Sequence, residues 1–351
     1  MKKLLLTTAL AGATLVASNA IAQTTVSGNL DISFKNLSRE GSGQTLTQAS
    51  QRGFGKEAQL NIQNKGKLNN GMDYAAGFSI EDDGNQTTTL FNENTYIDFI
   101  SGNTTITIGQ DHIQNNEASL ATFVGLVAED LTASENTTQF ATDGFLSAVG
   151  ANPHEAFGIG IMQKTPVGTL SAYYVPKNGD AVGNDDIAGD SADESAYELG
   201  FKGDLGVKGL SIHTFINEEN KAGADTRKSK GRSLGASYNM GQITAGVHYK
   251  ETEFGTSNVA RSVTANTTEQ IEYGIAYAAT ANLTLAANYT KAESKEVLAG
   301  SAVADAKSKS IAVGYNLGPV ALTAQAARLE NFNFVTDTDA DVLYLRASTK
   351  F

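Results

Sequence analysis

The sequence predicts an all-β protein, a 16-stranded antiparallel barrel that crosses a membrane with its strands. Three observations indicate this fold class. Apolar and polar residues alternate with a period of two, the connections between the alternating segments are short and long in turn, and no long apolar run follows residue 22. A period of two is that of a β-strand with one apolar and one polar face. Because strands cross a bilayer only in a closed sheet, we expect a transmembrane barrel.

Residues 1–22 are expected to be a signal peptide that is removed on export. They contain two lysines, an apolar run from Leu4 to Ala17, and a small-x-small cleavage sequence that ends at Ala22. The apolar run is too short to span a bilayer, although an uncleaved anchor is the alternative reading. Residues 23–351 are expected to form one domain, because the chain has only four prolines and no Pro- or Ser-rich linker.

Composition excludes several classes of function. The formal net charge is −12, so a nucleic acid is not an expected partner. The chain has no cysteine, which excludes disulfides and thiolate metal sites and suits an oxidising compartment. No motif specifies a cofactor, and none is expected.

The strand pattern is clear in the segment TVSGNLDISFK, where Val26, Ile32 and Phe34 share one face and Asp31 and Lys35 share the other. The same alternation recurs in residues 156–163, 196–203, 241–250, 270–278, 282–290 and 309–317. Helical spacing fits none of these segments. Tyrosines on the apolar parity, close to strand ends, are typical of the aromatic belts at membrane interfaces; they are Tyr174, Tyr197, Tyr238, Tyr249, Tyr273, Tyr289 and Tyr315.

Two kinds of connection separate the predicted strands. Turn-forming sequences predict seven short links, at Asn64–Gly66, Ser101–Asn103, Thr165–Gly168, Gly203–Gly206, Asn239–Gly241, Thr280–Asn282 and Gly318-Pro319. Eight longer polar stretches alternate with them, so the connections join 16 strands. In such a barrel the short turns are periplasmic and the long loops extracellular. An even number of strands also lets the first and last strands pair, which leaves no open edge.

Sixteen strands enclose an aqueous lumen, and one parity of the predicted strands is small or polar. That parity contains Ser27, Asn29, Asp31, Asp73, Asp98, Glu198, His213, His248, Glu272 and Arg346. The candidate pore-wall residues are Asp31, Lys35, Asp73, Asp98 and Arg346. For each of them, a solvated wall position without a dedicated binding role is the alternative reading.

Three segments resemble the general porins of the Gram-negative outer membrane, and the resemblance extends over essentially the whole mature chain. They are LNNGMDYAAGFSIE, NTYIDFISGNTTITIGQ and the terminal LYLRASTKF. The resemblance implies a homotrimeric channel for passive diffusion of small hydrophilic solutes and ions, in contact with outer-membrane lipids and lipopolysaccharide. It also implies that Phe351 is an outward-facing assembly signal for the barrel-assembly machinery. The chain departs from the family pattern at Thr349, where many outer-membrane strands carry a second aromatic residue.

The longest connection, residues 111–155, corresponds to the third loop of these porins. In the family this loop folds into the barrel and narrows the pore, so the candidate constriction residues are Asp111, Glu117, Glu129, Asp130, Glu135 and Asp143. The Pro-Glu-Phe-Gly-Gly run of the enterobacterial porins is not present here. From Leu68 to Gln163 there are 13 acidic residues and no lysine or arginine. Carboxylates in a narrow passage concentrate cations, so a preference for cations is expected.

Other functions are less well supported by the sequence. A substrate-specific outer-membrane channel, a structural or adhesive surface protein, and a secreted soluble β-protein are the alternatives for the whole chain. The four histidines belong to no motif of a catalytic triad, so an enzyme is not expected. The acidic segment Gly183–Glu194 does not have the spacing of an EF-hand, so no metal site is predicted there.

Overall fold

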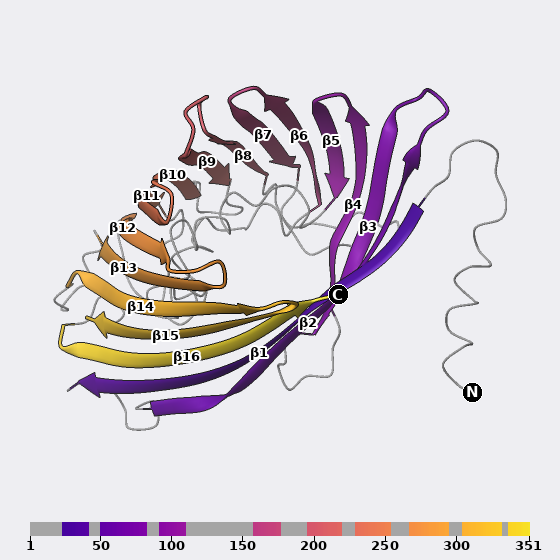
Figure 1. Ribbon diagram of the computed structural model, residues 1–351. Helices are drawn as coiled ribbons and strands as arrows, with labels where there is room; N and C mark the ends of the chain where they lie inside the picture. Colours follow the sequence, from indigo (N-terminus) through magenta and orange to yellow (C-terminus); the bar gives the residue numbers. More distant parts are fainter. Residues whose placement is uncertain are drawn as a thin grey trace, which may run out of the picture.

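The computed structural model describes residues 23–41, 50–82, 91–109, 157–176, 195–219, 229–253, 267–294, 304–331 and 336–351. These residues form sixteen strands arranged around one ring (Figure 1). The strands are β1 (Gln23–Gly41), β2 (Ser50–Lys67), β3 (Asp73–Asp82), β4 (Phe91–Ser101), β5 (Thr104–Gly109), β6 (Gly158–Thr165), β7 (Gly168–Val175), β8 (Ala196–Gly203), β9 (Leu210–Glu219), β10 (Ser229–Asn239), β11 (Ile243–Glu253), β12 (Thr267–Ala278), β13 (Leu283–Ser294), β14 (Ala306–Leu317), β15 (Val320–Glu330) and β16 (Thr338–Lys350). Within these ranges, no helix has the length and apolar character of a membrane span.

Each strand pairs antiparallel with the strands next to it in sequence, and the sheet closes through β1 and β16. The closing register runs from Asn29 opposite Lys350 to Gly41 opposite Thr338. Closure satisfies the backbone hydrogen bonds of both terminal strands, which an open edge would leave unpaired. The predicted 16-stranded antiparallel barrel is therefore confirmed.

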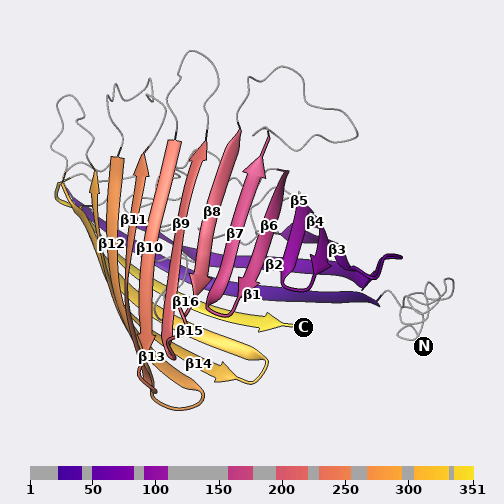
Figure 2. The same ribbon diagram turned by 90° about the horizontal axis from the view of Figure 1, so that it is seen from above.

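The short hairpin turns gather at one end of the barrel, here called the turn end; the opposite end is the loop end (Figure 2). Most of these turns contain a glycine with positive φ, among them Gly71, Gly102, Gly206, Gly241 and Gly318. A residue with a side chain adopts this conformation only with strain, which is why glycine marks the turns in the sequence.

One predicted turn was wrong. Asn64–Gly66 lies inside β2, and the chain reverses instead at residues 68–72, where the N–H of Gly71 donates to the carbonyl of Leu68 at 2.9 Å. The side chain of Asn64 explains the difference. Its amide Nδ2 donates to Thr24 Oγ1 at 2.9 Å, and its Oδ1 accepts from the hydroxyl of Tyr74 at 2.6 Å. Asn64 is thus held within the ladder by neighbouring strands, and local turn propensity does not decide its conformation.

The register separates the two faces of the wall. Ile108 of β5 lies opposite Ile159 of β6, while the adjacent residue Thr107 lies opposite Gly160. Ile108 and Ile159 are 48% and 49% exposed, whereas Thr107 is buried. Large exposed apolar side chains over a continuous face are unfavourable in water, but they are what a lipid-facing wall requires. The apolar parity is therefore the outer face, and the other parity is the lumen face.

The predicted tyrosines all lie on the outer face of the strands. Tyr273 and Tyr289 stack on neighbouring strands, with ring centroids 6.4 Å apart. This arrangement is that of an aromatic girdle, whose amphipathic rings occupy the boundary between lipid and water.

The lumen face departs from the sequence expectation near the loop end, where it is partly apolar. Val175, Leu329 and Val342 are buried there, and Tyr173, Val175 and Ala196 form a small apolar cluster. The strand pattern predicted small or polar residues on this whole face. These positions show that parity specifies the side of the wall but not whether the side chain on that side is polar.

Candidate functional site: the lumen face of the barrel wall

The five candidate pore-wall residues lie on the lumen face but in different surroundings. Asp31 and Lys35 belong to β1, Asp73 to β3, Asp98 to β4 and Arg346 to β16. Asp73 is exposed at the turn end, where it pairs with Lys67 at 2.5 Å, whereas Asp98 is only 7% exposed. The register therefore brings Asp31, Lys35 and Arg346 together at the closing seam and leaves Asp73 and Asp98 on the neighbouring wall.

Asp98 lies between β3 and β5, and a side chain of β5 holds its carboxylate. It lies opposite the small residue Ala75 of β3 and opposite Thr107 of β5, whose hydroxyl donates to Asp98 Oδ1 at 2.6 Å. A buried carboxylate needs such donors, because burial removes the water that would otherwise stabilise its charge. The side chain of Asp98 therefore has a defined orientation on the lumen face.

The seam between β1 and β16 carries charges of both signs. Arg346 Nη1 lies 3.9 Å from Asp31 Oδ2. Asp31 pairs directly with Ser348, which is two residues from Arg346 along β16. Lys35 lies on the same face, opposite Tyr344, and Glu57 of β2 lies opposite Asp31. Because acidic and basic groups lie next to one another at this seam, their electric fields in the lumen partly cancel.

A second group of titratable residues crosses β8 to β12 on the lumen face. His213 of β9 and His248 of β11 both lie opposite Gly235 of β10, so no side chain separates the two imidazoles along this row. The row continues on the lumen face with Lys202 of β8 next to His213 and Glu272 of β12 next to His248. The histidines are 1% and 3% exposed. Across the described part of the chain, no cluster of His, Asp or Glu has the arrangement needed to hold a metal ion.

Sequence reasoning placed the two histidines on the lumen parity but missed the lysines that accompany them. Lys202 and Lys250 lie on the same parity of their strands, so the alternation in AYELGFKG and GQITAGVHYK would have shown both. The described lumen face carries the acids Asp31, Glu57, Asp73, Glu81, Asp98, Glu198 and Glu272 and the bases Lys35, Lys65, Lys67, Lys164, Lys202, Lys250, Arg346 and Lys350. The described wall is thus close to balanced in charge.

The six candidate constriction residues lie outside the described residues, as does the whole predicted loop 111–155. They are Asp111, Glu117, Glu129, Asp130, Glu135 and Asp143. The summed charge of the described wall favours neither sign of ion.

A closed barrel with an apolar outer face and a polar lumen face is the architecture of a membrane channel. A family profile described as Gram-negative porin matches residues 7–333 of the chain. The chain belongs to the Gram-negative porin family. This porin is accordingly an outer-membrane channel protein.

Solved porin structures share the fold at low sequence identity. An anion-selective porin from Comamonas acidovorans superposes with a TM-score of 0.69 at 14% identity, over 94% of this chain and 100% of that chain. A loop L8 deletion mutant of the Vibrio cholerae outer membrane protein OmpT gives 0.67 at 12%, over 94% and 99%. A triple mutant of the Rhodopseudomonas blastica porin gives 0.59 at 12%, over 94% and 100%. No curated protein matches the chain in a sequence comparison. At these identities the structures show the fold alone.

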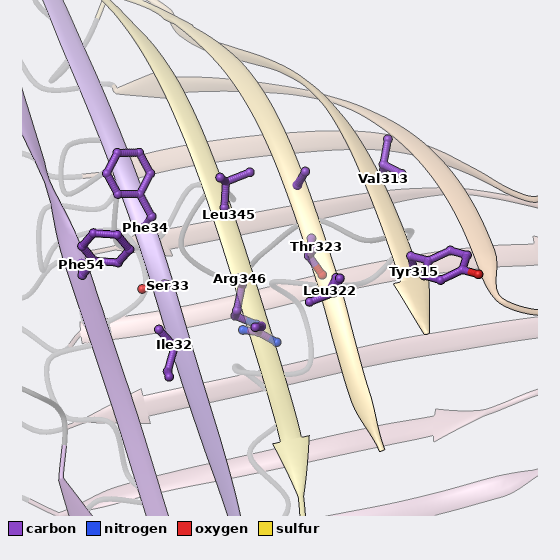
Figure 3. A pocket seen from close by; sticks show the side chains of 12 residues that line it. Ile32, Ser33, Phe34, Phe54, Val313, Tyr315, Leu322, Thr323, Leu345 and Arg346 are labelled. Atoms are coloured by element: carbon purple, nitrogen blue, oxygen red, sulfur yellow. The ribbon is translucent and has the colours of Figure 1, made fainter. Parts of the chain in front are cut away.

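The outer face of the porin has an apolar hollow of about 470 Å³ across β14, β15, β16, β1 and β2 (Figure 3). Phe34 and Phe54 lie side by side at one edge, with ring centroids 5.2 Å apart. The small side chains of Ala324 and Ala347 also line this hollow. Phe54 is 83% exposed, which makes the edge of the hollow an apolar projection beyond the barrel surface.

The terminal residue of the porin joins the barrel at the turn end. Phe351 pairs with Gly28 of β1 through backbone hydrogen bonds, and its side chain is 71% exposed. Gly28 shares the parity of Leu30 and Ile32, so Phe351 lies beside the outer face.

Proposed function

We propose that this porin is a passive, water-filled channel for small hydrophilic solutes and ions, that it prefers cations, and that it catalyses no reaction. The observation that carries the proposal is the closed sheet with an apolar outer face and a polar, charged lumen face. A passage lined by fixed polar groups replaces part of the hydration shell of a solute without binding the solute tightly.

The cation preference rests on the loop 111–155. The proposed constriction residues are Asp111, Glu117, Glu129, Asp130, Glu135 and Asp143, and the sequence from Leu68 to Gln163 supplies no base that could neutralise them. The proposed wall residues Asp31, Lys35, Asp73, Asp98 and Arg346 contribute both signs of charge. Cations would therefore concentrate at the constriction more than along the described wall.

The deciding experiment is a reversal potential in a planar bilayer under a gradient of potassium chloride. We expect the sign for potassium selectivity, larger at low ionic strength because salt screens fixed charges. Glu129→Gln with Asp130→Asn should reduce the potential without closing the channel. Glu293→Gln is the control, because Glu293 lies on the outer face, paired with Lys291. A potential with the sign for chloride selectivity would contradict the assignment.

The non-specific character of the channel has its own test. Liposomes that contain the porin should swell at rates that fall smoothly with the size of a neutral sugar. A single sugar that enters far faster than others of equal size would instead indicate a substrate-specific channel.

We also propose that the porin assembles as a homotrimer, with the apolar hollow of β14 to β2 at the contact between barrels. Small residues such as Ala324 and Ala347 permit close approach of a second apolar surface, while Phe34 and Phe54 offer area to bury. One of the similar solved structures, OmpT of Vibrio cholerae, is described as a trimer form.

Further proposals concern export and membrane contacts. Residues 1–22 would be removed on export, and Phe351 would serve as the signal that the barrel-assembly machinery reads. At the loop end, outer-face ion pairs such as Arg328 with Asp341 (2.9 Å) and Lys309 with Glu330 (2.6 Å) would lie at the level of lipopolysaccharide headgroups. Charged residues suit this level because it lies beyond the apolar band.

A further inference from the structure

A pocket of about 270 Å³ lies against the lumen face of β1 to β4. Its described lining includes the side chains of Ser27, Gln59, Asn61, Gln63, Asn94 and Tyr96, and none of its residues is charged. The charged residue Glu81 lies beside the pocket, bonded to Gln59, but the lining itself offers neutral hydrogen-bonding groups. Its volume is close to the lower limit of roughly 300 Å³ for small-molecule pockets.

Two backbone features create the pocket. Gly77 of β3 lies on the lumen face between Gln63 and Tyr96, so the middle strand contributes no side chain at this point. A Cβ at Gly77 would lie 3.1 Å from Tyr96 Cε1, which shows that the phenol ring leans over the glycine. A register shift interrupts the pairing of β3 with β4 after Gly77, and Asn94 has a positive φ of 49° there. Such a bulge redirects side chains in a strand.

The amides in the pocket are oriented by the wall. Asn61 Nδ2 donates to Gln59 Oε1 at 3.2 Å, and Gln59 Nε2 donates to Glu81 Oε2 at 3.0 Å. Gln63 Nε2 donates to the hydroxyl of Tyr96. A primary amide has two N–H donors and a carbonyl acceptor, so one bond to the wall fixes the side chain and leaves capacity for a solute.

We propose that this pocket is a low-affinity subsite for a small neutral polyhydroxylated solute of monosaccharide size. Each hydroxyl of such a solute both donates and accepts a hydrogen bond, and the oriented amides of Asn61 and Gln63 offer both kinds of partner. A neutral solute also enters without the desolvation penalty that an ion meets at an uncharged wall. The subsite rests on the proposed diffusion function and adds a preference to it.

The affinity must remain low for the solute to leave. A channel conducts when binding favours entry but does not prevent release. Binding on the order of millimolar concentrations is expected, the range in which a few water-exposed hydrogen bonds operate.

The test measures ion current through the reconstituted full-length porin while glucose is added. We expect the current to fall along a saturating curve. The double variant Asn61→Leu with Gln63→Leu, of similar side-chain size, should raise the half-saturating concentration at least about fivefold. Gln59 is left unchanged because its loss would remove the partner of Glu81. Gln270→Leu is the matched control, since Gln270 is a lumen-facing amide on the distant strand β12.

The outcomes of this experiment distinguish failure of the proposed subsite from failure of the proposed channel function. A linear, non-saturating fall in current for the wild-type porin would overturn the subsite while leaving the channel function in place. Equal saturation in the wild-type porin and the double variant would also overturn it. No current at all from the folded wild-type porin would contradict the proposed channel function, and the subsite with it. If the double variant does not fold, Asn61→Ala alone should still weaken saturation.

Discussion

The ring of the terminal residue Phe351 covers the face of Gly28. The N–H of Gly28 donates to the carbonyl of Phe351 at 2.8 Å, and the N–H of Phe351 donates to the carbonyl of Gly28 at 2.9 Å. A Cβ at Gly28 would lie 2.6 Å from Cζ of the phenylalanine ring and 2.7 Å from the backbone oxygen of Gln59, so a larger residue would force the ring or the strand to shift. This contact extends the closing pair of β1 and β16 to the end of the chain.

Replacement of Gly28 should therefore weaken barrel closure. We expect Gly28→Ala to destabilise the folded porin by about 1–3 kcal/mol, the usual cost of forcing an extra group into a packed site. Gly53→Ala is the control, because nothing lies within 4 Å of a Cβ at Gly53. The measurement is the urea midpoint of the refolded porin in lipid vesicles. Equal midpoints for the two variants would show that the close packing around Gly28 contributes nothing to stability.

Deletion of Phe351 tests its proposed role in assembly. Without the terminal ring, insertion should slow and degradation in the periplasm should increase, while export across the inner membrane continues. Quantitative immunoblots of outer-membrane and periplasmic fractions measure this. An unchanged level of the deletion variant in the outer membrane would contradict the proposed role of Phe351 as an assembly signal.

The hydrogen bond between Thr107 and Asp98 predicts a second stability effect. Thr107→Val removes the hydroxyl that donates to the buried carboxylate at 2.6 Å. Because hydrogen bonds to charged groups are strong, we expect a loss of about 1.5–3 kcal/mol. Thr105→Val, on the same face of β5, should change stability much less. A similar loss for both threonines in urea unfolding would show that the bond to Asp98 is not responsible.

Adjacent residues of β6 test the assignment of the two faces. Ile161 is on the outer face and Met162 on the lumen face. Ile161→Arg should cost about 2–4 kcal/mol, as expected for a charge near the middle of the bilayer. Met162→Arg should cost much less but should alter single-channel conductance. If Met162→Arg were the more destabilising change, the faces would have to be exchanged.

The proposed trimer contact can be separated from general lipid contact. Ala347 lines the apolar hollow, and Ala172 is a small outer-face residue of β7 on another part of the barrel. Arginine at either site meets lipid, but only Ala347→Arg should shift the porin from trimer to monomer in light scattering in mild detergent. If Ala172→Arg dissociated the trimer and Ala347→Arg did not, the contact between barrels would lie at β7 and not at the hollow.

The alternation of residues predicted most of the fold because a membrane barrel depends on local pattern. Asp31, Asp98 and Arg346 could be assigned to one parity, and that parity proved to be the lumen face. Local pattern was insufficient at Asn64, which has the propensity of a turn residue but lies in β2 because Thr24 and Tyr74 bond to its side chain. Propensity describes a residue alone, whereas these contacts come from strands distant in sequence.

By itself, the sequence of this porin determined the number of strands, the alternation of short and long connections and the face on which each strand residue lies. These properties follow from the two-residue period of a strand and from the need to pair every backbone N–H and C=O group within a membrane. Only the tertiary structure decided the register that places Arg346 near Asp31, His213 and His248 on either side of Gly235, and Gly77 beneath Tyr96. Register depends on pairing across strands, and side chains far apart in sequence meet only after the barrel has closed.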